Sequence, residues 1–462
     1  MSSPSKATLR ESELPALRDA RPRGGLREVG VLAYPVILTQ VSITTMHVVD
    51  SAMVGRLGAT ELGAVGFGGI WTWTAMCFFV GATTAVQTFV AQHHGAGEEE
   101  RCGAWTWQGF YAALPLTALG CVALLLGAGA LVHQVGPSPE LEPLATGYIR
   151  ARSLGGVGLV AAVSISSFFR GTGDTRTPLY TTVFANVVNV VLDYGLIFGE
   201  LGMPRLGVVG AGIATSIAEW IYLAGGLWFF SRSKVAQEFA TGWVAPSRDA
   251  IRRLLRTGLP IGGQWWLEMA SFAAFSALVV RMGDASMAAS QAFIVLLSIS
   301  FMQAIGLGIA VSTLVGRYIG ARDPASVERS FRSGLALSGV LAGVIALLFV
   351  AIPEALLGIF SSDPQVLALG RPLLLMGAAF QVFDAVAIVA DGALRGAGDT
   401  RWPMVVRFGL SWGLFLPLAY LVGITLEGGL LGAWSAGIVQ VALLAAVLVV
   451  RFRSGAWRRI QI

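Results

Sequence analysis

Acidic side chains stand inside long apolar stretches of this sequence, where a carboxylate is costly to keep. A charged side chain at the centre of a bilayer costs at least about 2.5–3.5 kcal/mol, so it is retained for a function. In low dielectric such a carboxyl group readily binds a proton. Two of them, together with amide or hydroxyl oxygens, instead make a site for a hard cation such as Na⁺. The acids are Asp50, Asp193, Glu268, Asp384 and Asp391.

Polar residues accompany these acids at helical spacing. Asn189 lies four residues before Asp193, and Gln264 lies four residues before Glu268, so each pair shares one face of a helix. We expect these faces to point into the protein interior rather than toward lipid. The alternative is that the acids only form hydrogen bonds between packed helices. Asp391, near the end of its stretch, is expected to be solvated or to cap a helix.

Composition indicates that the elements carrying these residues are membrane-spanning helices. Hydrophobic residues make up 55% of the 462 positions and charged residues only 13%, whereas about 25% of a soluble protein is charged. The apolar runs are long enough to cross about 30 Å of hydrocarbon, and they do not alternate as barrel strands do. The predicted fold class is therefore all-α integral membrane, with twelve transmembrane helices. They are expected at 29–55, 61–92, 105–133, 144–168, 178–199, 207–230, 252–281, 286–318, 330–359, 366–394, 402–424 and 428–451.

The chain contains an internal repeat. Residues Arg170–Pro178 read RGTGDTRTP, and residues Arg395–Pro403 read RGAGDTRWP, 225 positions later. Six spans per copy make the halves parallel, related by a pseudo-two-fold axis along the membrane normal. The same offset aligns Pro35 with Pro260, Arg56 with Arg281, Gly58 with Gly283 and Gly95 with Gly320.

The repeat predicts a two-lobe organisation. Transporters use such a plan because a site between two lobes can open alternately to either side of the membrane. The expected parts are a cytosolic N-terminal tail (1–28), an N-lobe of six spans (29–230), a cytoplasmic linker (231–251), a C-lobe of six spans (252–452) and a cytosolic C-terminal tail (453–462).

The repeated motif is expected to be scaffold. Its glycines allow a left-handed turn that ends a helix, and Asp174 or Thr175 can cap the next helix. Arg170 and Arg176 are expected to face the lipid headgroups, and a contribution of this short hinge to gating is the alternative.

The repeat also separates scaffold acids from specialised ones. Asp174 has an acidic counterpart at Asp399, 225 positions later. The membrane-embedded acids of each lobe have no acidic counterpart in the other, so the scaffold alone does not require them. These specialised acids are Asp50, Asp193, Glu268 and Asp384.

Basic residues indicate the orientation of the chain. They gather in the N-terminal tail, the central linker, the C-terminal end and the loops that an even number of spans separates from the N-terminal tail. The positive-inside rule therefore places both termini in the cytoplasm. The net charge of +5 reflects these loops rather than a nucleic-acid-binding surface. The three cysteines have no paired spacing, so neither a disulfide nor a zinc site is expected.

Motifs of enzymes are not found in the sequence. It has no phosphate-binding loop, nucleophile elbow or zinc motif. His93 and His94 are adjacent and point in different directions on a helix, which suits a loop feature rather than a metal site. We therefore expect no enzymatic activity, no catalytic residues and no cofactor.

Taken together, these residues resemble the multidrug and toxic compound extrusion (MATE) family, within the wider multidrug/oligosaccharidyl-lipid/polysaccharide flippase superfamily. The resemblance covers about residues 26–452. It rests on Val49–Gly58 (VDSAMVGRLG), on Gly258-Leu-Pro through Glu268, on Gln381–Ala385 (QVFDA) through Arg395-Gly396, and on both copies of the repeated motif.

The resemblance implies a secondary antiporter that exports cationic or amphipathic drugs or metabolites in exchange for H⁺ or Na⁺. Asp50 matches the acid in the first span of the family, and Glu268 and Asp384 match acids of NorM-type members. The polar pair of DinF-like members is matched by Asn189 and Asp193.

Two further positions follow from the resemblance. Thr215 matches the hydroxyl partner of the DinF-like pair, and Pro35 matches the proline at which the first span bends. Because the acids of both subfamilies are present, the resemblance does not decide which lobe carries the ion coupling. Apart from Na⁺ at Asp50, Asn189 and Asp193, no metal site is expected.

The sequence-based hypothesis is alternating access between two lobes in a bacterial plasma (inner) membrane. Small cationic organic substrates and the lipid bilayer are the expected partners, without nucleic acid, and the protein is expected to be a monomer. Ion or proton binding at Asp50, Asn189 and Asp193 would drive the cycle, and Glu268 and Asp384 would tune substrate charge or form a second ion site.

Two alternatives remain at this point. A flippase of lipid-linked oligosaccharides or peptidoglycan precursors would need a basic central cavity, whereas the interior here is acidic. A membrane hydrolase would need a catalytic pair in facing spans, and a channel would conduct ions without substrate.

Overall fold

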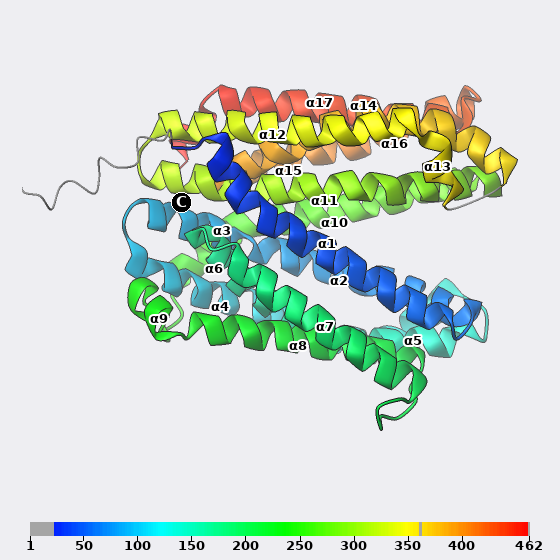
Figure 1. Ribbon diagram of the computed structural model, residues 1–462, viewed down its shortest axis with the longest axis horizontal. Helices are drawn as coiled ribbons and strands as arrows, with labels where there is room; N and C mark the ends of the chain where they lie inside the picture. Colours follow the sequence, from blue (N-terminus) through cyan, green and yellow to red (C-terminus); the bar gives the residue numbers. More distant parts are fainter. Residues whose placement is uncertain (1–22, 360–362, 461–462) are drawn as a thin grey trace, which may run out of the picture.

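The computed structural model describes residues 23–359 and 363–460, which form helices joined by loops with no strand among them (Figure 1). The first half contains α1 (Leu26–Gly55), α2 (Ala59–Thr83), α3 (Ala85–Gly95), α4 (Cys102–Val135), α5 (Leu141–Ser153), α6 (Gly156–Thr172), α7 (Arg176–Phe198) and α8 (Val208–Phe230).

The second half repeats this order after the linker helix α9 (Ser233–Phe239). It contains α10 (Arg248–Val280), α11 (Asp284–Gly320), α12 (Pro324–Ala351), α13 (Pro353–Gly358), α14 (Pro364–Gly396), α15 (Arg401–Phe408), α16 (Leu416–Tyr420) and α17 (Gly429–Arg453). Two π-helical stretches, η3 (Gly409–Phe415) and η4 (Leu421–Thr425), join α15 and α16 into one span.

These helices confirm the predicted all-α membrane fold. Within the described residues, ten helical segments are long and apolar enough to cross a bilayer, and α5 with α6 makes an eleventh, bent by 43°. The expected seventh span is α10, whose 33 residues include several charges in the first turns. At about 1.5 Å per residue, α10 also has the length of a span. Every predicted span coincides with a helix or a run of helices.

Hydrogen bonds between the halves follow the predicted pseudo-two-fold relationship. Thr88 Oγ1 on α3 donates to the carbonyl of Arg395 at 3.0 Å, and Thr313 Oγ1 on α11 donates to the carbonyl of Arg170 at 3.0 Å. Thr88 and Thr313 are 225 positions apart, as are Arg170 and Arg395. The same contact is therefore made twice, once from each half.

The crossing of α3 and α11 obeys the same relationship. A Cβ added to Gly95 would overlap the carbonyl oxygen of Arg317, and a Cβ added to Gly320 would overlap that of Gln92. Only glycine lets the two backbones approach so closely. The lobes meet at this crossing and diverge toward the opposite end (Figure 1).

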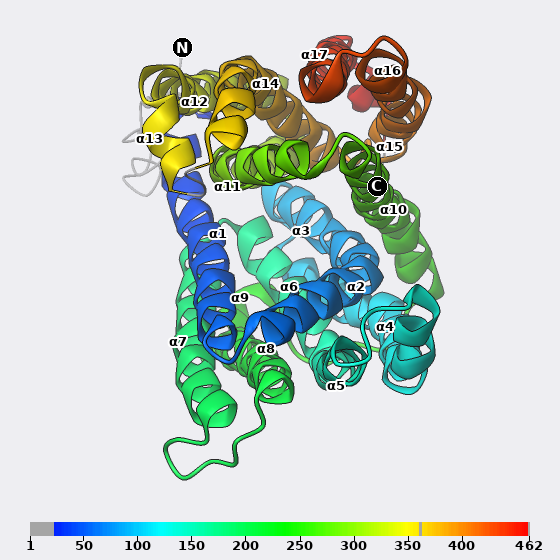
Figure 2. The same ribbon diagram turned by 90° about the vertical axis from the view of Figure 1, so that its right-hand side faces the viewer.

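The first helix of each half also packs against the other half (Figure 2). Val29, Leu32 and Ala33 of α1 belong to an apolar core formed mainly by α11, α12, α14 and α17. Leu254 and Ile261 of α10 belong to a core of the first half, with α3, α4, α6 and α8. Each lobe as predicted from the sequence is thus bridged to its partner by its own first helix.

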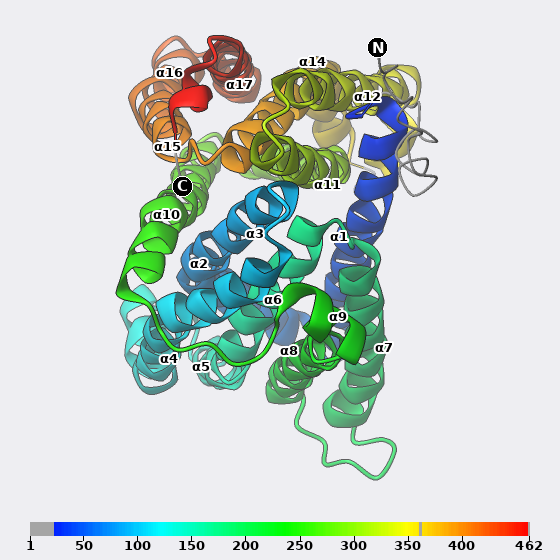
Figure 3. The same cartoon turned by 90° about the vertical axis from the view of Figure 1, so that its left-hand side faces the viewer.

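The described ends of the chain and the linker lie at the same end of the molecule (Figure 3). The carbonyl of Gly24 accepts a hydrogen bond from Ser333 Oγ at 2.9 Å near the start of α12. Trp457 packs in the core beside Phe452, and Thr241 of the linker accepts a bond from Trp107 of α4. This arrangement agrees with termini and linker on one side of the membrane. Most of the expected tail 1–28, and residues 461–462, lie outside the described residues.

The repeated motif forms the predicted turns. Gly173 and Gly398 have positive φ angles of 93° and 81°, and Asp174 Oδ1 accepts hydrogen bonds at 3.1 Å from the backbone N–H groups of Arg176 and Thr177. Asp174 therefore caps α7, as expected. Its counterpart Asp399 instead forms an ion pair of 2.9 Å with Arg451 of α17.

The headgroup prediction was wrong for the first arginine of each motif copy. Arg170 is only partly exposed and its Nε is buried, and Arg395 forms an ion pair of 2.5 Å with Asp391. The chain turns inward at each motif to reach the contact between the lobes, so these side chains are partly covered. Arg176 and Arg401 are exposed, as expected.

Candidate functional site

A buried cluster of two carboxyl groups and one amide joins α1 to α7. The amide of Asn189 is assigned with its nitrogen toward the two acids, because only this orientation sets a donor against their oxygens; it then donates to Asp50 Oδ1 at 2.9 Å and to Asp193 Oδ2 at 3.2 Å. The helical spacing of four residues places Asn189 and Asp193 on one face of α7, as predicted, and α1 brings Asp50 to that face. Residues far apart in sequence thereby form one site.

The cluster is withdrawn from the outer surface. Asp50 is 8% exposed, and Asn189 and Asp193 are 0% exposed. Asp193 Oδ1 has no hydrogen-bond partner among the described residues. A buried carboxylate oxygen without a partner is costly, so the cluster is suited to receive a proton or a small cation.

Two further residues predicted for this site have separate roles in the structure. Thr215 is buried on α8, but its hydroxyl donates to the Ala211 carbonyl of the same helix at 2.9 Å. Pro35 lies inside α1, where its ring removes one backbone hydrogen bond. Thr39 Oγ1 donates to the Pro35 carbonyl at 2.7 Å, a bond that favours helix bending.

Sequence reasoning missed an ion pair in the same lobe. Arg152 Nη2 on α5 lies 2.9 Å from Glu219 Oε1 on α8, and the two side chains are only 14% and 11% exposed. Both residues fall within predicted spans, at 144–168 and 207–230. A charge inside a predicted span was the signal that identified Asp50, and it applies equally to this pair.

The C-lobe acids have a basic partner that the sequence analysis did not identify. Glu268 Oε1 on α10 forms an ion pair of 2.9 Å with Arg407 Nη1 on α15. Asp384 on α14 lies close enough to interact with both charges. Gln381, one turn before Asp384, is 2% exposed, and its amide atoms have no partner among the described residues. The second cluster thus contains two acids, one cation and an unsatisfied amide.

The expectation for Asp391 was wrong. It is 4% exposed, and its Oδ2 lies 2.5 Å from Arg395 Nη2 and 3.3 Å from the donor Gln264 Nε2. The position near the end of the span suggested contact with solvent, but the side chains of Gln264 from α10 and Arg395 from the last turn of α14 contact the carboxylate instead. Gln264 therefore contacts Asp391 rather than Glu268.

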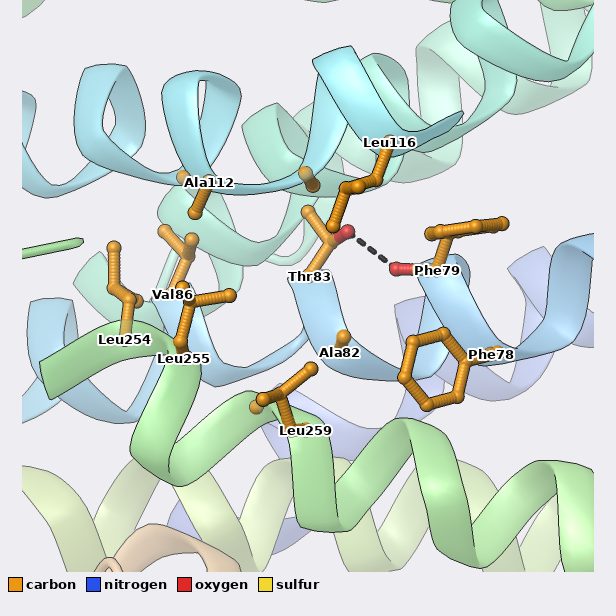
Figure 4. A pocket seen from close by; sticks show the side chains of 13 residues that line it. Phe78, Phe79, Ala82, Thr83, Val86, Ala112, Leu116, Leu254, Leu255 and Leu259 are labelled. Carbon is orange, nitrogen blue, oxygen red and sulfur yellow. Dashed lines mark hydrogen bonds between the residues drawn. The ribbon is translucent and has the colours of Figure 1, made fainter. Parts of the chain in front are cut away.

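Two hollows lie away from the acids. One is an apolar crevice of about 30 Å³ between α2, α4 and α10, in which Phe78, Leu116 and Leu259 face one another (Figure 4). The other, of about 780 Å³, lies at the start of α10 and α15. It is lined by Arg252, Arg253, Arg256, Arg401, Asp249 and Leu255. The first is too small for an organic substrate, and the second gathers positive charge beside the linker.

A metal site built from several strong ligands is not found within 23–359 and 363–460, where no group of three His, Cys, Asp or Glu side chains is placed to hold an ion. His93 Nδ1 instead lies 2.6 Å from Glu98 Oε2 at the end of α3. The hydrogen bond from His93 holds the pKa of Glu98 below its ordinary value.

Comparison with known proteins identifies the family. The MatE family model matches the chain twice, over residues 35–195 and over residues 260–421. The two matches begin 225 residues apart, which is the offset of the internal repeat. The model thus recognises both halves of the chain.

Relatives match nearly end to end. The chain is 30% identical over 455 residues to the multidrug resistance protein PmpM of Pseudomonas aeruginosa, with 97% of this chain and 95% of that protein covered. It is 29% identical over 457 residues to the probable multidrug resistance protein NorM of Thermotoga maritima, with 98% and 96% covered.

Solved structures share the fold. The eukaryotic MATE transporter AtDTX14 aligns with a TM-score of 0.84 at 19% identity, covering 94% of this chain and 96% of that one. An outward-facing conformation of a multidrug resistance MATE family transporter aligns with a TM-score of 0.83 at 19% identity, covering 95% and 98%. With the family match in both halves, the chain belongs to the MatE family of multidrug and toxic compound extrusion transporters.

Proposed function

We propose that this protein exports cationic or amphipathic small molecules in exchange for H⁺ or Na⁺. The observation that carries the proposal is the buried cluster of Asp50, Asn189 and Asp193, with one carboxylate oxygen left unpartnered among the described residues. A proton or a Na⁺ ion would satisfy that oxygen. Relatives named for multidrug resistance support small organic molecules as the substrates.

The Asn189 amide suits either coupling ion. With its nitrogen toward Asp50 and Asp193 it donates to both, and one proton shared by the two carboxyl groups would reduce their charge from −2 to −1. Turned by 180°, the same amide presents its oxygen, and Na⁺ prefers oxygen ligands from carboxylates and amides. Thr215 on the neighbouring helix α8 would then supply a further oxygen by rotating its hydroxyl.

The C-lobe cluster would act on the substrate. Glu268, Asp384 and Arg407 together carry one net negative charge when all are ionised. Such a cluster attracts organic cations, and the unsatisfied amide of Gln381 would bind a polar group of the substrate. A second ion site at Glu268 and Asp384 is the alternative role for these acids.

Alternating access would use the contact between the lobes. The lobes are joined at the end that carries the termini and the linker. If that end faces the cytoplasm, as the basic residues indicate, this conformation is open to the outside. The similarity to an outward-facing transporter supports this assignment. Pro35 in α1 would serve as the hinge, since α1 contacts both lobes.

Efflux from proteoliposomes tests the proposal. Proteoliposomes containing the purified protein would be loaded with ethidium, an organic cation. Ethidium efflux would be measured under an imposed pH gradient or an imposed Na⁺ gradient, one at a time. We expect one gradient to drive efflux. Asp50→Asn should abolish the driven component, because a neutral amide cannot exchange charge with the ion, whereas the exposed Asp249→Asn should leave it intact.

Full gradient-driven efflux by Asp50→Asn would overturn the assignment of the site. The flippase alternative finds little support in the interior, where Arg152 is paired with Glu219 and Arg407 with Glu268. The charge of each of these arginines is balanced by a carboxylate, so neither pair supplies the net positive charge that a pyrophosphate needs.

A further inference from the structure

The fourth span is broken near its middle, between α5 and α6, where the chain bends by 43°. In a membrane, backbone groups freed by a break need partners inside the protein. Ser216 Oγ donates to the Ala151 carbonyl at 2.7 Å, and Trp220 Nε1 donates to the Leu154 carbonyl at 2.9 Å. One face of α8 therefore holds the break together.

The Arg152–Glu219 ion pair belongs to this same contact. Arg152 is one residue from Ala151, and Glu219 lies between Ser216 and Trp220 on α8. A Cβ added to Gly155 at the break would overlap Glu219 Oε2. The carboxylate of Glu219 is thus pressed against the bend itself.

Only one of the two hydrogen bonds that this ion pair could form is present. Arg152 Nη2 contacts Glu219 Oε1 at 2.9 Å, but Arg152 Nη1 and Glu219 Oε2 have no hydrogen-bond partner in the part of the chain that the structure describes. A guanidinium offers two parallel donors for a carboxylate. Here one of them is left free in the protein interior.

Arg152 lies near the acids of the proposed cation site. Ile149, three residues before it on α5, packs in one buried core with Val54 of α1 and Ile197 of α7, which are four residues after Asp50 and Asp193. Arg152 interacts electrostatically with both Asp50 and Asp193. The other titratable groups around the pair are His47 of α1, Tyr148 of α5 and Cys121 of α4. Arg152 is the fixed positive charge among them.

We propose that Arg152 is a positioning residue of the cation site, held by Glu219 through Nη2 and free to bind the Asp50–Asp193 carboxylates through Nη1 when the cation leaves. This inference rests on the proposed function. With a cation bound, the carboxyl groups need no further donor and Arg152 stays with Glu219. Once the site is empty, two carboxylates attract the guanidinium, and α5 moves relative to α8 at the break.

The proposal assigns opposite effects to the two partners. Arg152 competes with the coupling cation for the carboxylates, so it weakens cation binding and permits release. Glu219 restrains Arg152, so it favours cation binding. If the pair only stabilised the fold, removing either partner would not shift cation affinity in opposite directions.

Three variants of the full-length protein, reconstituted in proteoliposomes, test this assignment. Glu219→Gln frees Arg152 and should weaken the apparent affinity for the coupling cation. The double variant Arg152→Gln/Glu219→Gln leaves no buried unpaired charge, so it should fold, and it should bind the cation about tenfold more tightly, a shift of about one pH unit if the ion is H⁺. Arg150→Gln, an exposed arginine on the same helix, is the matched control.

The readout is ethidium efflux as a function of pH or Na⁺ concentration, with KM for the cation separated from the maximal rate. An unshifted double variant, or shifts of the same sign in Glu219→Gln and the double variant, would overturn the role of Arg152. If wild-type protein shows no response to either gradient, the proposed function fails instead, and the two failures are thereby distinguished.

Discussion

Glu268 on α10 and Arg407 on α15 form an ion pair of 2.9 Å in which Arg407 is 13% exposed and Glu268 38% exposed. The pair joins the seventh and eleventh spans of the chain, 139 positions apart in sequence. The ion pair also places the guanidinium of Arg407 beside Asp384. The sequence pattern identified only the acids of this cluster.

Arg407→Gln should therefore both destabilise the protein and strengthen its binding of organic cations. The loss of a charged hydrogen bond to a part-buried acid costs about 1–3 kcal/mol, and two unopposed acids attract a cation more strongly. Thermal unfolding in detergent and equilibrium binding of ethidium measure the two effects. Arg371→Gln, which removes an exposed ion pair to Glu354, should change neither. Unchanged ethidium affinity in Arg407→Gln would show that this cluster does not contact the substrate.

Asn189→Ala should abolish gradient-driven efflux while the protein still folds. Without the amide, Asp50 and Asp193 lose the donor that holds them together, and the site binds its cation poorly. We expect at least a tenfold loss of driven efflux, measured as the initial rate in proteoliposomes. Asn186→Ala is the matched control, because Asn186 also joins α7 to α1, through Ser42 at 2.7 Å. Equal losses in both variants would mean that the contact is only structural.

Gly95→Ala should separate the lobes at their crossing. The added methyl group would overlap the Arg317 carbonyl, and a backbone atom cannot move aside cheaply. A spin-label distance between α3 and α11 should lengthen, and efflux should fall. Gly97→Ala is a poor control because Gly97 has a positive φ angle, whereas Gly339→Ala has open space around it and should be neutral. An unchanged distance in Gly95→Ala would contradict the tight crossing.

Asp323 gives a pH-dependent contribution to stability outside the membrane. Hydrogen bonds from the Ser326 hydroxyl and backbone N–H hold the pKa of Asp323 below its ordinary value. A lowered folded-state pKa stabilises the protein above the ordinary value, and this stabilisation is lost as pH falls through the folded-state pKa.

Asp323→Ala should thus cost about 1 kcal/mol at pH 7, as expected for a lost helix cap. The difference in unfolding free energy between wild type and variant should shrink below about pH 4. Chemical unfolding at several pH values measures it. A difference that persists at low pH would show that the charge of Asp323 plays no part.

Much of the fold was predictable because the bilayer fixes the length and polarity of a span. The repeat then supplied the symmetry of the two halves. The span expected at 252–281 coincides with α10, although charges in its first turns weaken the apolar signal. The acids Asp50 and Asp193 were predictable as a site because helical spacing puts Asn189 beside one of them. Their contact with each other required α1 and α7 to be placed side by side.

The ion partners were harder to predict. Glu219 and Arg407 are single charges in otherwise apolar spans, Arg152 shares its span with Arg150, and the sequence does not say which helix faces meet. Asp391 was misjudged for a related reason, since depth along a helix does not reveal what packs over its end. The break between α5 and α6 has only small residues as its signal, and these occur throughout the chain.

The exchange of first helices has a mechanical consequence. Because α1 is anchored in the core of the second half and α10 in the core of the first, neither lobe can swing as a separate rigid body. Any rotation of one lobe must bend or slide the helix that this lobe contributes to the core of the other lobe. In the proposed transport cycle, loading at one lobe would therefore be transmitted to its neighbour as strain along α1 or α10, and the two halves would advance together.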